Sequence, residues 1–391
     1  MYVQRYDEGS HHFHTSRPVF NWLVFGPLCA GSLMQAESRI ASLWQQRMDA
    51  LREYHVVREG NVFGAGIAGS CVFSSEYDKA KILLSNLMTR YEGVSFNSLF
   101  SGVETANENG RCIVLESNHD LPLQPFDTNR LEREMLGDLT LVRGVGEVTQ
   151  RRLKSRGYRT IIDLISHPKF RHEARQVLEL LNRADPVEVM GLIGLRHEKS
   201  HRFALGTASS FEPENYVFLD IEPLGLFSRP IILFGIGTIE QKRLIVRQYL
   251  LRDINEEASA LTEISSQFIS GKKALVTFNG KAFDLPYLQD RLAYYGLGAI
   301  PRILHFDVLH FSRRQWKKQL SSCRLSALEF TILKINRTED LPGQMVPEFY
   351  ETYLRTQNCG PLLPIVDHNR QDVVSLARLF FYLLQECYGC S

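Results

Sequence analysis

The chain has few cysteines, almost no net charge, and neither an internal repeat nor a low-complexity tract. Its seven cysteines are odd in number and scattered over 391 residues, unlike the dense framework of a disulfide-stabilised secreted domain. We therefore expect a reduced, cytoplasmic protein. The lone C-x-x-C pair, Cys387 and Cys390, has no second pair with which to form a zinc site. The net charge of +1 identifies no partner, because charge is unevenly spread along the chain.

Long uncharged runs are also scarce. The stretch from Pro18 to Ala36 has the length of a short membrane span, but Asn21, Gly26 and Pro27 interrupt it. We expect a buried or partner-covered segment and no membrane association, with a membrane role as the alternative. An amphipathic helix is expected over Gln35–Val57. Residues 1–137 as a whole form a region of uncertain α+β structure. Their sequence indicates neither a function nor a protein partner.

The apolar content of 44% is sufficient for two or three domains with sizeable cores. The C-terminal half has the pattern of an α/β domain. Strands are expected at 216–222, 231–238, 243–250 and 273–278, with a helix over 253–270 and mostly helices thereafter. Strands followed by alternation with helices predict a mixed β-sheet flanked by helices. We place this domain at 205–391 and a small helical module at 138–200.

The helical module contains the segment "VRGVGEVTQRRLKSRGYRTIIDL". Gly144 and Gly146 flank Val145 directly before a helix expected to begin near Glu147, and a second helix is expected from Thr160. Glycines at such a turn expose backbone N–H groups, and the helix N-terminus adds positive potential. Together these can hold a phosphate without reading a base.

The same segment is strongly basic. Between residues 143 and 175 nine Lys and Arg face three acids, an excess of six that suits a nucleic-acid backbone. The segment resembles a helix-hairpin-helix motif, which implies sequence-nonspecific DNA binding, with Arg151 and Lys154 among the phosphate contacts. The alternative is a packing or protein-contact unit.

Carboxylates follow two expected strands. In "YVFLDIE", Asp220 and Glu222 are two residues apart and therefore face the same way. Two carboxylates in one site repel each other, and a divalent cation with oxygen ligands relieves the repulsion. Asp284 follows the next apolar strand after the Asn279-Gly280 turn, where α/β sites assemble. The alternatives are an acid pair in a surface turn and a helix N-cap at Asp284.

Near the C-terminus, "VDHNRQDVVSLARL" places His368 and Asp372 four residues apart on one face of an expected helix. The pair could be a surface contact. The order D-x-E, D, D nevertheless resembles the DEDD exonucleases of the ribonuclease H-like superfamily. The blocks "HFDVLHFSRRQW", "SCRLSALEFTIL", "DLPG", "PEFYETYLRT" and "HNRQDVVSLARL" further resemble the YprB-type ribonuclease H-like domain family of predicted exonucleases.

The resemblance implies a ribonuclease H-like fold and a site for two Mg²⁺ or Mn²⁺ ions. It implies that Asp220, Glu222, Asp284 and Asp372 are catalytic metal ligands and that His368 is the general base. The four-residue His–Asp spacing is that of the Tyr-containing subgroup, whereas the His subgroup commonly has one residue more. The spacing leaves the subgroup open.

Further residues could support the site or the substrate. His305 and Asp307 are expected beside the metal ligands, as supporting or structural groups. Asn279 could place Asp284 or touch the substrate. "SRRQWKKQ" could hold a single strand by charge and by stacking on Trp316, with a solvated helix face as the alternative. The expected nucleic-acid contacts in this part of the chain are Arg313, Arg314, Lys317 and Arg324.

The leading hypothesis is a metal-dependent 3′–5′ exonuclease, on DNA rather than RNA. The alternatives are a non-catalytic nucleic-acid-binding or scaffold protein with the same fold, and a structure-selective endonuclease. The presence of all four acids favours catalysis over the scaffold.

Overall fold

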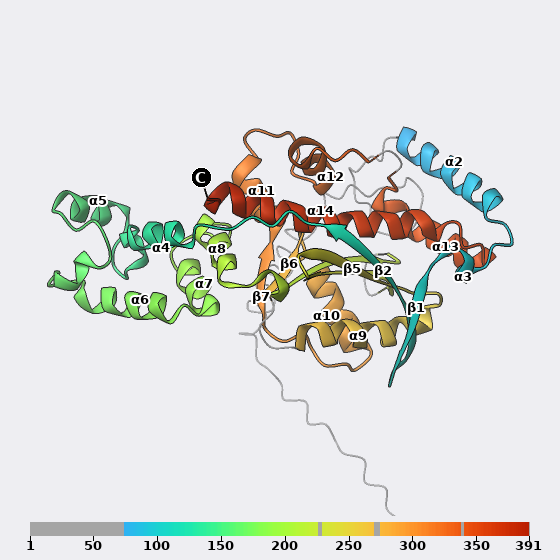
Figure 1. Cartoon of the computed structure of the whole chain (residues 1–391), viewed down its shortest axis with the longest axis horizontal. Helices are drawn as coiled ribbons and strands as arrows, with labels where there is room; N and C mark the ends of the chain where they lie inside the picture. The colour runs from blue at the N-terminus through green and yellow to red at the C-terminus, as the bar shows by residue number, and fades with distance from the viewer. Residues whose placement is uncertain (1–73, 226–228, 270–273, 338–339, 391) are drawn as a thin grey trace, which may run out of the picture. The chain divides into compact units, whose positions relative to one another are not determined.

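The apolar run that begins at Tyr216 forms the strand β3 (Tyr216–Pro223), which lies inside a seven-stranded sheet (Figure 1). The structure is a computed structural model that describes residues 74–225, 229–269, 274–337 and 340–390. The apolar stretch 18–36 and the expected helix 35–57 lie outside these residues. Within the described ranges, no helix has both the length and the apolar character needed to cross a membrane.

The sheet has the order β1-β2-β5-β4-β3-β6-β7. Strands β3, β6 and β7 run parallel, and the other neighbouring pairs are antiparallel. The expected α/β class with a mixed, helix-flanked sheet is therefore confirmed. The other strands are β1 (Gly102–Asn107), β2 (Gly110–Asp120), β4 (Ile231–Glu240), β5 (Arg243–Leu250), β6 (Ala274–Thr277) and β7 (Leu304–Asp307).

Strands β1 and β2 come from the region for which the sequence indicates no function. Strand β2 pairs antiparallel with β5 from Ile113↔Leu250 to Asp120↔Arg243, and β1 pairs with β2 at the edge. The sheet thus draws on residues 102–120 as well as on the expected domain 205–391.

Helices cover both faces of the sheet (Figure 1). The alternating residues Tyr216 and Phe218 of β3 share a core with Phe380 of α14 (Leu362–Tyr388). Val217 and Leu219 belong to a second core, together with residues of α9 (Glu257–Ile269) and α10 (Asp284–Tyr294). Since side chains alternate along a strand, Asp220 and Glu222 lie on the α14 face of the sheet.

The remaining helices are shorter. They are α2 (Ser74–Arg90), α3 (Phe96–Leu99), α4 (Thr128–Leu136), α5 (Glu147–Ser155), α6 (Arg171–Arg183), α7 (Pro186–Gly194), α8 (Arg202–Gly206), α11 (Val308–Trp316), α12 (Leu325–Leu328) and α13 (Val346–Thr356). Short 3₁₀ helices are η1 (Leu139–Leu141), η2 (Asp163–Ser166), η3 (Thr207–Ser210), η4 (Pro213–Asn215), η5 (Ile254–Glu256) and η7 (Gly343–Met345), and η6 (Glu329–Leu333) is a π-helix.

Helices α4 to α8 form a module that packs on the C-terminal part of α14 (Figure 1). The Tyr388 hydroxyl donates to Arg202 O at 3.0 Å, and the Phe126 and Phe381 rings stack with their centroids 6.4 Å apart. The module shares the core that covers the α14 face of the sheet. It is therefore joined to the sheet domain through α14.

Candidate active site

Strand β3 carries the first two acids. Glu222 is 8% exposed and Asp220 is partly buried, while Ile221 between them points into the opposite core. Asp220 pairs across the sheet with Gly235 of β4. The apolar residues that fix the strand therefore determine where both carboxylates lie.

Asp284 joins them at the point where the sheet opens. Strand β6 pairs with β3 only as far as Phe218↔Val276. Beyond that pair, the backbone N–H of Ile221 donates to Asp284 Oδ1 at 3.2 Å. The carboxylate thus replaces the missing strand as hydrogen-bond acceptor beside Asp220 and Glu222. Its side chain does not act as the N-cap of α10, because that position is Phe283.

Helix α14 brings His368 and Asp372 to the sheet because two glycines of β4 leave room for it. A Cβ at Gly235 would lie 2.4 Å from Asn369 Oδ1, and one at Gly237 would lie 2.8 Å from Val373 Cγ1. Larger residues would push the helix away. Asn369 is fully buried and donates from Nδ2 to Asp220 Oδ2 at 2.8 Å.

A second amide fixes Asn369. Gln248 of β5 donates from Nε2 to Asn369 Oδ1 at 2.9 Å and to Val366 O at 2.8 Å. The orientation of Asp220 is thus set by a chain of buried amides. The sequence analysis missed Asn369 and Gln248, although two glycines within an apolar strand are a signal of close backbone approach.

The acids of this site are buried against one another. Burial raises the pKa of Glu222 to about 7 and that of Asp284 to about 8. Burial, with the nearby charges of Asp372, Glu222 and Asp284, raises the pKa of Asp220 well above its ordinary value. Carboxylates whose ionised forms disfavour one another are suited to a divalent cation with oxygen ligands.

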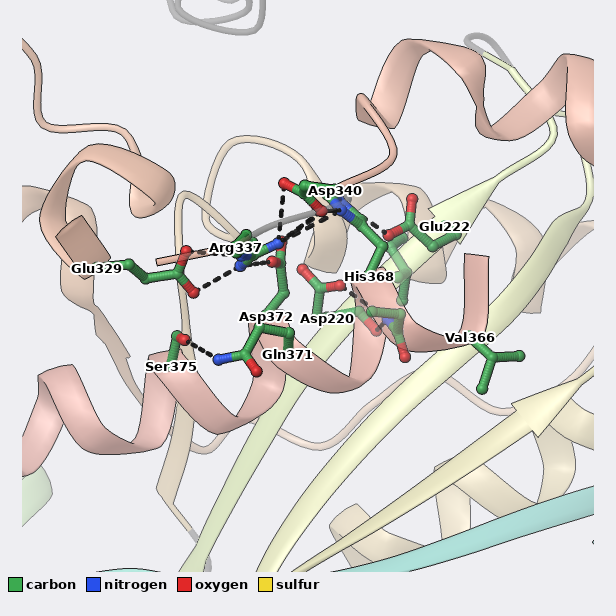
Figure 2. Close-up of polar contacts among 12 residues, drawn as sticks. Asp220, Glu222, Glu329, Arg337, Asp340, Val366, His368, Gln371, Asp372 and Ser375 are labelled. Atoms are coloured by element: carbon green, nitrogen blue, oxygen red, sulfur yellow. Dashed lines mark hydrogen bonds and ion pairs between the residues drawn. The ribbon is translucent and has the colours of Figure 1, made fainter. Parts of the chain in front are cut away.

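The carboxylates of Asp220, Glu222, Asp284 and Asp372 therefore suit the expected divalent metal, although their side chains are not arranged as a complete coordination shell. In the described part of the chain, no three His, Cys, Asp or Glu side chains form a ready-made group of metal ligands. Asp372 Oδ1 accepts a hydrogen bond from Arg337 Nη2, so one of its oxygens is already engaged (Figure 2).

Arg337, Glu329 and Asp340 are part of the site and were missed by sequence reasoning. Arg337 forms a two-pronged ion pair with Glu329, with Nη2–Oε1 at 2.6 Å and Nε–Oε2 at 2.7 Å. It also donates from Nη1 to Asp340 Oδ1 at 3.2 Å (Figure 2). Only the blocks "DLPG" and "SCRLSALEFTIL" indicated that Asp340 and Glu329 lie in segments typical of the family.

His368 lies between two sets of carboxylates (Figure 2). Its Nδ1–H donates to Asp340 Oδ1 at 2.7 Å, and its Nε2 lies 3.9 Å from Glu222 Oε1 and 3.8 Å from Asp372 Oδ2. Burial opposes protonation of the ring, but Asp372, Asp340 and Glu222 raise the pKa of His368 to about 10. The hydrogen bond to Asp340 leaves Nε2 directed at the acids.

The turn after β6 is supported by Asp307 and His305. Asp307 is fully buried and accepts hydrogen bonds from the backbone N–H of Asn279 at 2.8 Å and of Lys281 at 3.1 Å. His305 Nε2 lies 2.8 Å from Thr277 Oγ1. Asn279 is 2% exposed and has a left-handed backbone with φ of 65°. Its Nδ2 has no hydrogen-bond partner among the described residues.

The basic hairpin segment, residues 143–175, lies in the helical module. Helix α5 begins at Glu147 as expected, and Gly144 has a positive φ of 85°. All nine Lys and Arg side chains are exposed, and none forms an ion pair with a described residue. The nine are Arg143, Arg151, Arg152, Lys154, Arg156, Arg159, Lys169, Arg171 and Arg175.

Two expectations require correction. The second helix expected from Thr160 is only the 3₁₀ turn η2, although Asp163 Oδ2 accepts from the Thr160 N–H at 2.8 Å as a cap would. Trp316 is 6% exposed and belongs to the core on the α14 face, with its ring centroid 6.2 Å from that of the exposed Tyr382. It is unavailable for base stacking, because it lies on the buried side of α11.

The basic residues around α11 and α12 differ in accessibility. Arg314 is exposed and pairs with Glu198 at 3.2 Å, and Arg313 is partly buried. Lys317 and Arg324 are exposed, and Arg324 is the N-cap residue of α12 without a side-chain cap bond. The contact of these four side chains with a substrate stays a prediction.

Comparison with known proteins identifies the domain that carries the carboxylates. A family model described as the RNase_H superfamily matches residues 217–384. The chain is also 33% identical over 217 residues to the uncharacterized protein YprB of Bacillus subtilis (strain 168), a match that covers 54% of this chain and 48% of YprB. The chain therefore spans about half the length of this curated relative.

Residues 217–384 are thus a ribonuclease H-like domain. The similarity to YprB supports a domain of the YprB type, as the sequence motifs predicted. A ribonuclease H-like fold indicates a nuclease, with a nucleic acid as partner and divalent metals as the usual cofactors. The helix-hairpin-helix assignment stays a prediction.

Proposed function

We propose that this protein is a metal-dependent 3′–5′ exonuclease that acts on DNA. The observation that carries the proposal is that Asp220 and Glu222 of β3, Asp284 of α10, and His368 and Asp372 of α14 converge around residues 220–222. Structural acids are normally paired one by one with bases, whereas the pKa values of Asp220 and Glu222 are raised by burial and by neighbouring carboxylates.

Asp220, Glu222, Asp284 and Asp372 would hold the divalent cations. Mg²⁺ or Mn²⁺ held by these residues would supply a nucleophilic water and would stabilise the charge on the leaving oxygen. The chain orients these ligands through Asn369 and through the Ile221 backbone N–H, so that little reorganisation is needed during the reaction.

His368 would accept the proton of the attacking water. Asp340 holds its Nδ1–H, which leaves Nε2 as the basic atom beside Glu222 and Asp372. Asp372, Asp340 and Glu222 raise the pKa of this imidazole to about 10 and so favour its protonated form. Neutralising Glu222 and Asp372 would lower that pKa and make Nε2 a better proton acceptor.

The basic hairpin segment would hold the nucleic acid away from the cleavage site. It belongs to the module that packs on the end of α14 near Tyr388, sixteen residues beyond Asp372. That separation is about 24 Å along the helix axis, or roughly seven base pairs of duplex. Exposed cations in a module attached at that end of α14 favour binding of the nucleic-acid backbone over a role in the chemistry.

The test is degradation of linear single- and double-stranded DNA and RNA labelled at the 3′ or 5′ end, compared with circular DNA. The wild-type protein with Mg²⁺ or Mn²⁺ should shorten linear DNA stepwise from its 3′ end, and Asp220→Asn should lower the rate by about 10³-fold or more. Cleavage of circular DNA would replace the proposal with an endonuclease. DNA binding without metal-dependent cleavage would replace it with a binding or scaffold protein.

A further inference from the structure

Arg337 is a buried cation placed directly against one of the proposed metal ligands. Its side chain is 12% exposed, and it contacts the carboxylates of Glu329, Asp340 and Asp372 (Figure 2). Glu329 is 1% exposed, and its carboxylate binds this guanidinium and the Ser375 hydroxyl. Glu329 therefore holds the Arg337 guanidinium in place at the edge of the acidic site.

A second buried pair in the protein shows what is unusual here. Arg291 and Glu257 are 4% and 0% exposed and meet at 2.5 Å, between α9 and α10. The Arg291 guanidinium binds Glu257 and lies over the rings of Tyr294 and Tyr295. Arg337 contacts two acids in addition to Glu329, and one of them is Asp372. Structural pairing with Glu329 alone does not require those contacts.

We propose that Arg337 is a built-in counter-cation for Asp372 that lowers the affinity of the site for divalent metal. The inference rests on the proposed function, because it assumes that Asp372 is a metal ligand. Arg337 engages Asp372 Oδ1, while Asp372 Oδ2 faces His368 Nε2 at 3.8 Å. One carboxylate oxygen is thus left for a cation.

The guanidinium stays in place when metal binds, because its departure would leave Glu329 buried and unpaired. An uncompensated buried charge of this kind is strongly unfavourable. The metal must therefore bind next to a fixed positive charge that shares Asp372 with it. At a separation of about 6 Å across one carboxylate, repulsion between a unit charge and a divalent cation amounts to roughly a factor of ten in affinity, even at the dielectric constant of water.

The experiment measures binding of Mn²⁺ alone to the full chain by electron paramagnetic resonance of the free ion. Arg337→Met should bind Mn²⁺ about tenfold more tightly than the wild type. Arg337→Lys retains the charge and should keep an affinity close to that of the wild type, although it loses the two-pronged contact. A role in packing alone would affect both variants in the same way.

Two double variants serve as controls for misfolding and for the general effect of removing a buried ion pair. Glu329→Gln/Arg337→Met removes the buried pair without leaving Glu329 uncompensated, and it should still bind Mn²⁺ more tightly than the wild type. Glu257→Gln/Arg291→Met removes the matched pair elsewhere and should lower the melting temperature without changing Mn²⁺ affinity. Circular dichroism establishes that each variant is folded.

The inference is overturned if the folded Arg337→Met and Glu329→Gln/Arg337→Met proteins bind Mn²⁺ no more tightly than the wild type. It is also overturned if Arg337→Lys tightens binding as much as Arg337→Met. Failure of every protein, including the wild type, to bind Mn²⁺ would instead refute the metal site of the proposed function, and the inference with it.

Discussion

In the candidate active site the charged groups are buried and linked to one another, whereas in the basic hairpin segment they are exposed and unpaired. Asp220, Glu222 and Asp284 lie close together, and burial and neighbouring carboxylates raise the pKa of each. The nine basic residues of 143–175 project into solvent from a small module. The first arrangement stabilises a charge at a defined point, and the second attracts a polyanion without fixing its position.

The two regions also obtain their positions differently. The site is assembled from β3, α10 and α14, which are far apart in sequence, and it depends on the close approach at Gly235. The basic hairpin segment is local and needs little more than the turn at Gly144 and the start of α5. We therefore expect site variants to change catalytic rate and module variants to change nucleic-acid affinity.

Among variants that distinguish the candidate active site from the module, we expect the largest change in kcat at His368. His368→Asn removes the proposed base and should lower kcat by about 10²-fold, with little change in KM or in Mn²⁺ affinity. Asp340→Asn leaves the ring in place but weakens its orientation, so a smaller loss of about tenfold is expected. Steady-state kinetics on 3′-labelled DNA would show both changes.

A higher KM with an unchanged kcat in His368→Asn would contradict the role of His368 as the base. His368 would then be a substrate-binding residue, the role proposed for the basic residues of the module. Equal losses in Asp340→Asn and His368→Asn would mean that Asp340 is required for the base to act at all.

A smaller effect is expected in the module. Arg151→Ala/Lys154→Ala removes two exposed cations and should weaken duplex DNA binding about tenfold at physiological salt. The slope of log affinity against log salt should fall by about two. Fluorescence anisotropy with labelled DNA would measure both quantities. Arg111→Ala/Arg243→Ala is the matched control, because these exposed arginines pair with Glu104 and Asp120.

If the control pair weakened DNA binding as much as the module pair did, net charge alone would explain the binding. If neither pair mattered, the module would be the packing or protein-contact unit that the sequence left as the alternative. A fall in kcat of Arg151→Ala/Lys154→Ala at saturating DNA would mean that the module takes part in catalysis. The two regions would then not have separate roles.

Much of the site could be predicted because its acids follow regular patterns. Asp220 and Glu222 share a strand face through the two-residue period, and His368 and Asp372 share a helix face through the four-residue spacing. Arg337 and Asp340 follow no such pattern. Their contacts with Asp372 and His368 join residues about 30 positions apart, and only the packing of the intervening segments brings them together.

The errors have physical causes of the same kind. Trp316 stands among basic residues in the sequence, but the sequence does not say which face of α11 is buried. Strand β2 joins the sheet by pairing with β5, a partner more than 120 residues away, and β1 pairs with β2. A strand pattern is local, but its partner at that distance is not, which is why residues 102–120 had no predicted place in the sheet.

The smallest expected effect is the pH dependence of stability without metal. Raised pKa values of about 7 for Glu222, about 8 for Asp284 and about 10 for His368 mean that the folded protein binds more protons than the unfolded chain. Stability should therefore fall as pH rises from 6.5 to 9. Below 6.5, His201 and His305, whose pKa values burial lowers to about 4 and about 3, act in the opposite direction.

Urea unfolding with EDTA should show this loss as a midpoint concentration that falls steadily from pH 6.5 to pH 9. Mg²⁺ should restore more stability at pH 9 than at pH 6.5, because it binds the deprotonated acids. Arg151→Ala/Lys154→Ala should leave the slope unchanged, since its exposed groups are not coupled to the site. Stability could instead be independent of pH, or depend on pH equally with and without Mg²⁺. Either result would mean that the acids are not the coupled, metal-binding group that distinguishes the candidate active site from the module.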